Sequence, residues 1–120
     1  MRSHERLQVW EGAIDFVVRI YKTTESFPRD EKFGLTSQIR RAAVSVPANI
    51  AEGAARQSPK EFSYFLSNPQ GSVSELATEI LIARRLGYVN EQTYRVDNDE
   101  LTSIGRMILG LARSIKQRNP

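Results

Sequence analysis

The sequence contains no cysteine and a single histidine, His4. The absence of cysteine excludes disulfide bonds and thiolate metal ligands. With one histidine, near the N-terminus, the chain cannot supply the paired Glu-x-x-His motifs of di-iron proteins. We therefore expect no metal site and no cofactor.

Long apolar runs are also missing, since no stretch approaches the roughly 20 residues that cross a bilayer as a helix. The first ten residues, MRSHERLQVW, lack the apolar core of a secretory signal. We expect no membrane partner and, by default, a cytoplasmic location.

Catalytic and nucleotide-binding motifs are absent as well. The sequence has no G-x-S-x-G elbow, no P-loop, no G-x-G-x-x-G, and no RRM, KH or zinc-finger signature. We therefore predict no catalytic residues. A weaker enzyme hypothesis would use a carboxylate cluster of Glu52, Glu75 and Glu79, but we favour pairing of Glu75 and Glu79 with arginines across a helix interface.

With 120 residues, 40% of them hydrophobic and 26% charged, the chain has the composition of one globular domain. We predict a single domain over 1–120, with frayed ends at 1–6 and 117–120.

The segment 33–56 has an unusual distribution of residue types around a helix. At about 100° per residue, one face is apolar: Leu35, Ile39, Ala42, Val46 and Ile50. Small residues lie nearly opposite: Val44, Ala48, Ala51 and Ala55. Between them runs a stripe that we call the polar stripe: Gln38, Arg41, Ser45, Asn49 and Glu52. A surface helix normally has one apolar face and a broad charged back, so we predict a closed homo-oligomer formed through this helix.

Pro47 lies in the middle of that pattern and cannot donate a hydrogen bond to the Ala43 carbonyl. Either the helix kinks there or two helices meet, and the apolar pattern, which continues in phase across Pro47, favours a kink. Upstream, Asp30 is the predicted N-cap of this same helix.

Three further helices are predicted from apolar spacing. The first carries Leu7, Trp10, Ile14, Val17, Val18 and Tyr21, with Trp10 and Tyr21 expected in the core. The third starts at an N-cap, Ser58, ends at Gly87, and is kinked or broken near Asn68-Pro69. The last starts after Asn90, or later at Asp97 or Asn98, and carries Leu101, Ile104, Ile108, Leu111 and Ile115, with Gly105 and Gly110 permitting close packing. The fold class is therefore all-α: an antiparallel up-down-up-down four-helix bundle with kinked second and third helices.

The chain is mildly basic, with a net charge of +3, and 13 of its 17 basic residues are arginine. This bias suits phosphate contacts, although a GC-rich genome explains it equally well. The residues that we consider for nucleic-acid binding are Arg40, Arg84, Arg85, Arg113, Lys116 and Arg118. For Arg41 we favour an ion pair with Glu52, Glu75 or Glu79; for most of the others both interpretations stay open. Tyr64 and Tyr88 are candidates for exposure but lie in no nucleic-acid motif.

Several segments resemble one protein family: LQVWEGAIDFVVRIY, FPRDEKFGLTSQIRRAAVSVPANIAEGAAR, SPKEFSYFL, GSVSEL and IARRLGY. They resemble small bacterial four-helix-bundle proteins encoded in intervening sequences of 23S ribosomal RNA genes. The accessory protein of diversity-generating retroelements is similar to that family. The resemblance spans Leu7 to Tyr88.

This resemblance implies a ring-shaped homo-oligomer, commonly a pentamer. In the retroelement branch, a basic surface of the ring is associated with nucleic acid and the reverse transcriptase. The positions that match the family's central string would serve fold and assembly: Gly34, Leu35, Thr36, Gln38, Arg40, Arg41, Ala42, Ser45, Pro47, Asn49, Ile50, Ala51, Glu52 and Gly53. The chain departs from the family at Asn68-Pro69-Gln70 and at Ala77, where the family tends to have glutamate.

The leading functional hypothesis is thus a non-catalytic oligomer that binds RNA, DNA or a nucleic-acid-processing protein through basic residues. The alternative is a protein-interaction scaffold with no nucleic-acid role.

Overall fold

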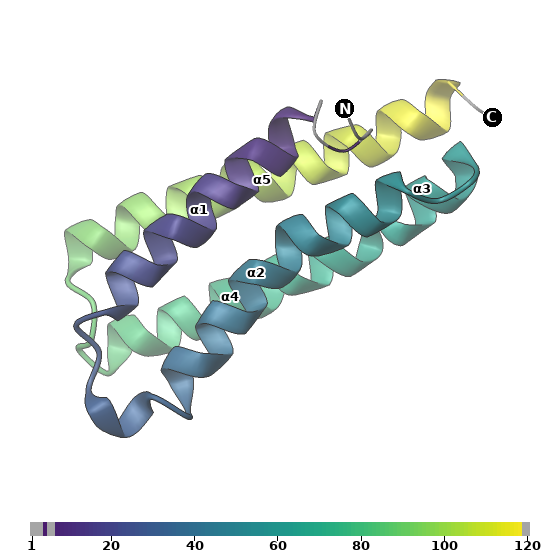
Figure 1. Cartoon of the computed structure of the whole chain (residues 1–120). Coiled ribbons are helices and arrows are strands. Elements are labelled where there is room, and N and C mark those ends of the chain that lie inside the picture. Colours follow the sequence, from purple (N-terminus) through teal and green to yellow (C-terminus); the bar gives the residue numbers. More distant parts are fainter. Residues whose placement is uncertain (1–3, 5–6, 119–120) are drawn as a thin grey trace.

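The computed structural model describes residue 4 and residues 7–118, with only the backbone of Arg118, and these residues are helical with no strand. The elements are α1 (Gln8–Thr24), the 3-10 helix η2 (Arg29–Glu31), α2 (Leu35–Ala54), α3 (Pro59–Phe65), α4 (Ser67–Arg85) and α5 (Glu91–Arg118). Figure 1 shows an elongated bundle in which α1 lies beside α5 and α2 lies beside α4. The all-helical prediction is confirmed. The ends predicted to fray lie outside the described residues at 1–3, 5–6 and 119–120, whereas 117 and 118 end α5.

Local hydrogen bonds at the helix ends follow from the capping residues. The Ser58 hydroxyl accepts a hydrogen bond from the Glu61 amide at 3.1 Å, and the Asn90 side chain accepts one from the Thr93 amide at 2.8 Å. Gly87 has a positive φ of 81°, and the Tyr88 amide returns to the Ala83 carbonyl at 3.0 Å, which closes a Schellman motif. All three predicted caps are confirmed.

The predicted N-cap at Asp30 is wrong. The segment 29–31 forms η2, and α2 begins only at Leu35. The carboxylate of the next residue, Glu31, takes the capping role, because its Oε1 accepts a hydrogen bond from the Leu35 amide at 3.1 Å. Its Oε2 accepts one from the Tyr88 hydroxyl at 2.9 Å. Glu31 therefore joins the start of α2 to the turn that follows α4.

The apolar face of α2 forms the middle of the core. Its five predicted residues are all buried between α1 and α4: Leu35, Ile39, Ala42, Val46 and Ile50. The opposite face of α2 is exposed to solvent: Val44 is 43% exposed, and Ala48 and Ala55 are also exposed. Pro47 lies inside one continuous helix, so two helices do not meet there. The kink stays a prediction.

The predicted third helix is divided at Leu66 into α3 and α4. Pro69 lies in the first turn of α4, where its missing amide cannot bond to the Phe65 carbonyl. Leu66 itself keeps right-handed helical angles, with φ −66° and ψ −10°. The chain therefore continues in nearly the same direction despite the break, and of the two predicted outcomes the break is the one that the structure supports.

The predicted core face of α1 is wrong for several residues. The buried side chains are Val9, Ala13, Phe16, Ile20 and Thr24. The predicted stripe lies to one side of that face, with Ile14, Val18 and Tyr21 between 38% and 53% exposed. The helix carries two overlapping apolar stripes one residue apart, and packing against α2 and α5 buries the stripe that contains Phe16.

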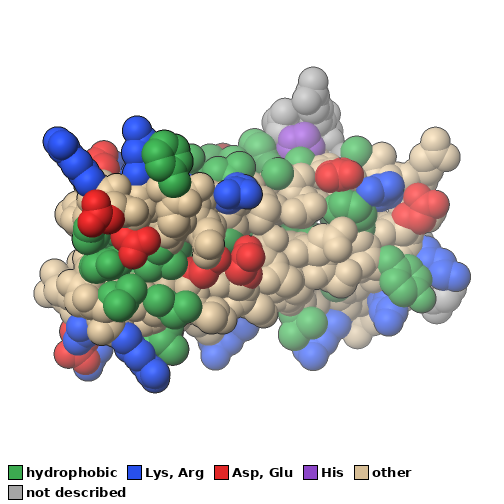
Figure 2. Space-filling view, turned by 90° about the horizontal axis from the view of Figure 1, so that it is seen from below, with side chains coloured by type: hydrophobic (Ala, Val, Ile, Leu, Met, Phe, Trp, Pro, Cys, Tyr) green, Lys and Arg blue, Asp and Glu red, His purple; other side chains and the backbone are tan. Residues whose placement is uncertain are grey.

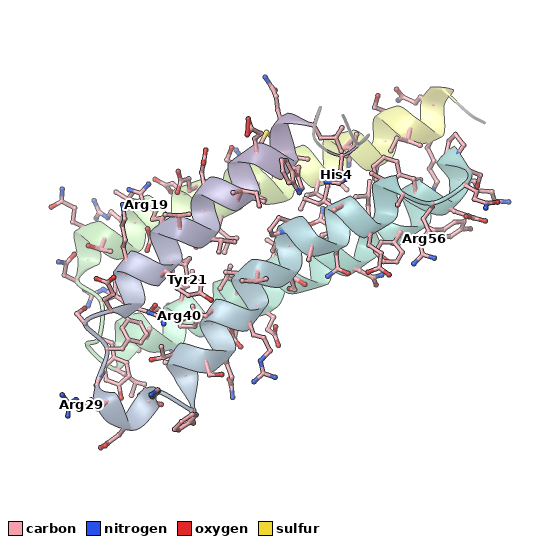
Figure 3. All side chains as sticks on the ribbon, in the orientation of Figure 1. His4, Arg19, Tyr21, Arg29, Arg40 and Arg56 are labelled. Carbon is pink, nitrogen blue, oxygen red and sulfur yellow. The ribbon has the colours of Figure 1, made fainter. Side chains whose placement is uncertain are left out.

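A buried carboxylate connects α1 to α5. Asp97 is 1% exposed, and its Oδ1 lies 3.0 Å from the Arg19 Nε. Its Oδ2 accepts a hydrogen bond from the Thr23 hydroxyl at 2.9 Å. Arg19 also reaches Glu100 at 3.2 Å, from the position labelled in Figure 3. These contacts offset part of the cost of burying the charge.

The predicted apolar face of α5 is confirmed for Leu101, Ile104 and Ile108, which are buried, while Leu111 and Ile115 are half-buried against the core. Of the two glycines expected to permit close packing, only Gly105 does so: an added Cβ would lie 3.4 Å from Val73 Cγ1, whereas nothing lies within 4 Å of Gly110. None of the described helices is long and apolar enough to cross a membrane.

Gly53 provides a stability test of the contact between α2 and α3. An added Cβ would lie 3.1 Å from Phe65 and 3.2 Å from Phe62. We expect Gly53→Ala to lower the free energy of unfolding by about 1–3 kcal/mol through overpacking, measured by urea denaturation. The matched control, Gly110→Ala, should raise it by about 0.5–1 kcal/mol, because alanine favours an open helical position. Equal effects of the two substitutions would contradict the close approach at Gly53.

Candidate functional site

The middle of the polar stripe lies along the line where α2 meets α4. The hydroxyls of Ser45 and Ser72 are hydrogen bonded at 2.7 Å across this line. The Asn49 amide nitrogen donates to the Ser45 carbonyl at 2.7 Å. Both Ser45 and Asn49 are half-buried, so the stripe is a packed polar contact between two helices at this point.

The ends of the stripe are exposed. Gln38 and Arg41 lie at the surface, and the Arg41 guanidinium donates to the Ser37 hydroxyl at 3.5 Å. Glu52 pairs at 3.4 Å with Arg56, which lies just beyond the end of α2. The preferred Arg41–Glu52 pair is therefore not formed within one chain.

Glu79 is the most unusual side chain in this region. It is 7% exposed on α4, and its Oε1 has no hydrogen-bond partner among the described residues. Burial, together with the negative charge of nearby Glu75, raises the pKa of Glu79 from 4.5 to about 7. Glu79 thus holds a proton more tightly in the folded protein than in the unfolded chain.

The predicted pairing of Glu75 and Glu79 with arginines is absent from the described part of the single chain. The ion pairs there join Arg19 to Asp97 and Glu100, Arg56 to Glu52, and Arg95 to Glu91. Glu52 is held by Arg56 and does not join a cluster with the two α4 carboxylates. No group of three or more His, Asp or Glu side chains that could hold a metal ion occurs in residue 4 or residues 7–118.

The Arg40 side chain forms part of the contact between α1 and α2. Its guanidinium lies 4.4 Å from the centre of the Tyr21 ring and donates to the Thr24 hydroxyl at 2.8 Å and to the Tyr21 carbonyl at 3.2 Å. Figure 3 shows Arg40 and Tyr21 facing each other between the two helices. These contacts are sufficient to explain this arginine without a ligand.

The other predicted nucleic-acid residues are divided between the two ends of the 47 Å bundle. Arg84 and Arg85 end α4, near η2, at what we call the loop end. Arg113 and Lys116 lie in the last turns of α5, beside α3, at what we call the terminal end. Figure 2 shows Lys and Arg side chains along one long edge of the face in view and at both of its ends. The Arg118 side chain lies outside the described residues.

Two features of the terminal end were not predicted from the sequence. Lys60 and Lys116 line a hollow of about 640 Å³ together with the side chain of Tyr64, which is 71% exposed. Arg56 stacks on the Phe65 ring at 4.3 Å nearby. The signal was present in the sequence, because Lys60 and Tyr64 are four residues apart in a helix that starts at Pro59.

A family profile described as 23S rRNA-intervening sequence protein matches residues 5–110. The fold is similar to that of a crystal structure from Bacteroides thetaiotaomicron, a protein of unknown function from the S23 ribosomal protein family. The TM-score is 0.77 at 25% sequence identity, covering 87% of this chain and 97% of that one. No curated protein matches the sequence.

Glu79 gives a pH-dependent prediction. In the folded protein the pKa of Glu79 is about 7, above its ordinary value of 4.5. The free energy of unfolding therefore falls as the pH rises from 4.5 to about 7, and above that range the buried carboxylate is charged and the whole loss of stability is present. Glu79→Gln should therefore change stability little near pH 4.5 and stabilise the protein at pH 8, by up to about 3 kcal/mol. Thermal unfolding of both proteins at several pH values measures this difference. A gain that does not change with pH would contradict the raised pKa.

Proposed function

The chain belongs to the 23S rRNA-intervening sequence protein family, and we propose that it is a non-catalytic cytoplasmic homo-oligomer that binds nucleic acid, or a ribonucleoprotein, through exposed basic residues. The observation that carries this proposal is the set of cations without carboxylate partners at the two ends of the bundle. Arg84, Arg85, Arg113 and Lys116 form no ion pair within the described part of the chain.

Unpaired cations of this kind attract phosphates without reading sequence. Each phosphate that a cation neutralises releases counterions, so binding weakens as salt rises. Because Arg84 and Arg85 are adjacent at the C-terminus of α4, they also lie where the helix dipole is negative. The helix dipole therefore stabilises both positive charges in the free protein. The two charges lie together at the loop end of the molecule.

Self-association is supported by an exposed apolar face formed jointly by α1 and α2. Ile14, Val18 and Tyr21 of α1 and Val44 of α2 are each 38–53% exposed, and the stacking of Arg40 on Tyr21 joins the two helices along this face. We call these four residues the α1–α2 face. A second copy of the chain would remove them from water, and the family resemblance implies a ring of five.

We also propose the antiparallel up-down-up-down arrangement of the bundle. Two pairs of contacts support it, because in each pair the residue number rises on one segment while it falls on the other. Glu31 with Tyr88 and Ser45 with Ser72 relate the segment 31–45 to the segment 72–88. Arg19 with Glu100 and Thr23 with Asp97 relate α1 to α5. This arrangement places the loop end and the terminal end at opposite poles of each subunit.

The alternative function is a protein-interaction scaffold that has no nucleic-acid role. The α1–α2 face is the observation that favours it, since an exposed apolar patch also suits a different protein. The two functions differ in their response to salt: phosphate binding weakens steeply, whereas apolar docking does not.

Binding to nucleic acid is tested by fluorescence anisotropy with RNA and DNA, single-stranded and duplex, titrated from low to physiological salt. We expect a steep log–log salt slope, and we expect the double variant Arg84→Gln/Arg85→Gln to flatten it by about one to two. Arg95→Gln is the control, because Arg95 already pairs with Glu91 at 3.2 Å. Absence of binding at low salt would refute the nucleic-acid function.

Assembly is tested separately by multi-angle light scattering. Val44→Asp should reduce the mass to that of smaller species, because it places a charge in the α1–α2 face, and Ser103→Asp on exposed α5 is the matched control. Arg41→Glu tests whether the polar stripe also contributes. If both variants keep the wild-type mass, α2 is not the contact between copies.

A further inference from the structure

The terminal end contains a groove between α3 and the last turns of α5. Its volume is about 640 Å³. The residues that line it are Pro59, Lys60, Ser63, Tyr64, Ser67, Ile115, Lys116 and Gln117. No carboxylate is among them, so the two lysines set the charge of the groove.

The ring of Tyr64 is exposed within this groove. Its side chain is 71% exposed, although burial of an aromatic ring normally stabilises a fold. Tyr64 also lines a second hollow, of about 450 Å³, together with Arg56, Phe65 and others. The residue therefore separates two hollows and is accessible from both.

Two lysines line the groove beside Tyr64. Lys60 precedes Tyr64 by one helical turn, and Lys116 faces the same groove from α5. The second hollow is different, because it contains Glu61 as well as Arg56, and Arg56, labelled in Figure 3, stacks on Phe65 and pairs with Glu52 at 3.4 Å. The uncompensated positive charge therefore lies in the groove with the two lysines. An accessible aromatic ring beside positive charges is the arrangement with which proteins bind single-stranded nucleic acid, by stacking bases and attracting phosphates.

We propose that this groove binds a single strand of RNA or DNA, with one base stacked on Tyr64 and the neighbouring phosphates held by Lys60 and Lys116. The inference rests on the proposed nucleic-acid function and adds the type of strand and the residue that selects it. A duplex does not satisfy the site, because its bases are already stacked on one another and cannot reach the ring.

The test uses the full chain and labelled oligonucleotides of about twelve nucleotides, as single strands and as the matching duplex. Tyr64→Ala should weaken single-strand binding roughly 5- to 100-fold, the usual range for loss of one stacked base. Tyr64→Phe should keep most of the affinity, because the ring remains. Duplex affinity should be unchanged in both variants. The double variant Lys60→Gln/Lys116→Gln should weaken single-strand binding and flatten its salt slope. If Tyr64→Phe loses binding as Tyr64→Ala does, Tyr64 does not act by stacking.

The other outcomes separate this inference from the function on which it rests. If wild type binds no nucleic acid, both are wrong. If it binds but Tyr64→Ala matches wild type, the inference is wrong and the function remains. If polyglutamate binds as tightly as the single strand, and Lys60→Gln/Lys116→Gln weakens both while Tyr64→Ala weakens neither, the groove is a site for acidic chains and the inference is wrong. If Tyr64→Ala lowers the mass in light scattering, the groove is a contact between copies.

Discussion

The constraint on which the structure depends is that a helix can bury only one face in a bundle of this size. In α2 that face runs from Leu35 to Ile50 and lies between α1 and α4. Burying it leaves Val44 and Ala48 outside and places the polar stripe along the line with α4. The exposed α1–α2 face and the Ser45–Ser72 contact both follow from burying this face of α2.

Features set by a few neighbouring residues could be predicted from the sequence. Ser58, Asn90 and Gly87 act through hydrogen bonds or backbone angles within five residues, so no distant partner can change their roles. The core face of α1 is different. Its two apolar stripes have similar spacing, and only packing against other helices distinguishes Phe16 from Tyr21.

The candidate site shows the same limit. Spacing placed Ser45 and Asn49 on one stripe, but it could not show that Ser72 of α4 completes their contact. Nor could it show that Arg40 stacks on Tyr21, because that depends on how α1 packs. The exposure of Tyr64 was predicted, but its groove was not, because the groove also needs Lys116, which lies more than fifty residues away in the sequence.

The contact between Asp97 and the helix formed by residues 8–24 joins the first and last elements of the chain. During synthesis on the ribosome, α1 emerges first but has no α5 against which to bury Phe16 and Ile20. The long separation between partners slows closure, because a large loop must be ordered before these contacts form. The nascent protein therefore exposes the apolar side chains that α5 covers until the last helix leaves the exit tunnel, and a chain truncated before α5 would be a target for chaperones and proteases.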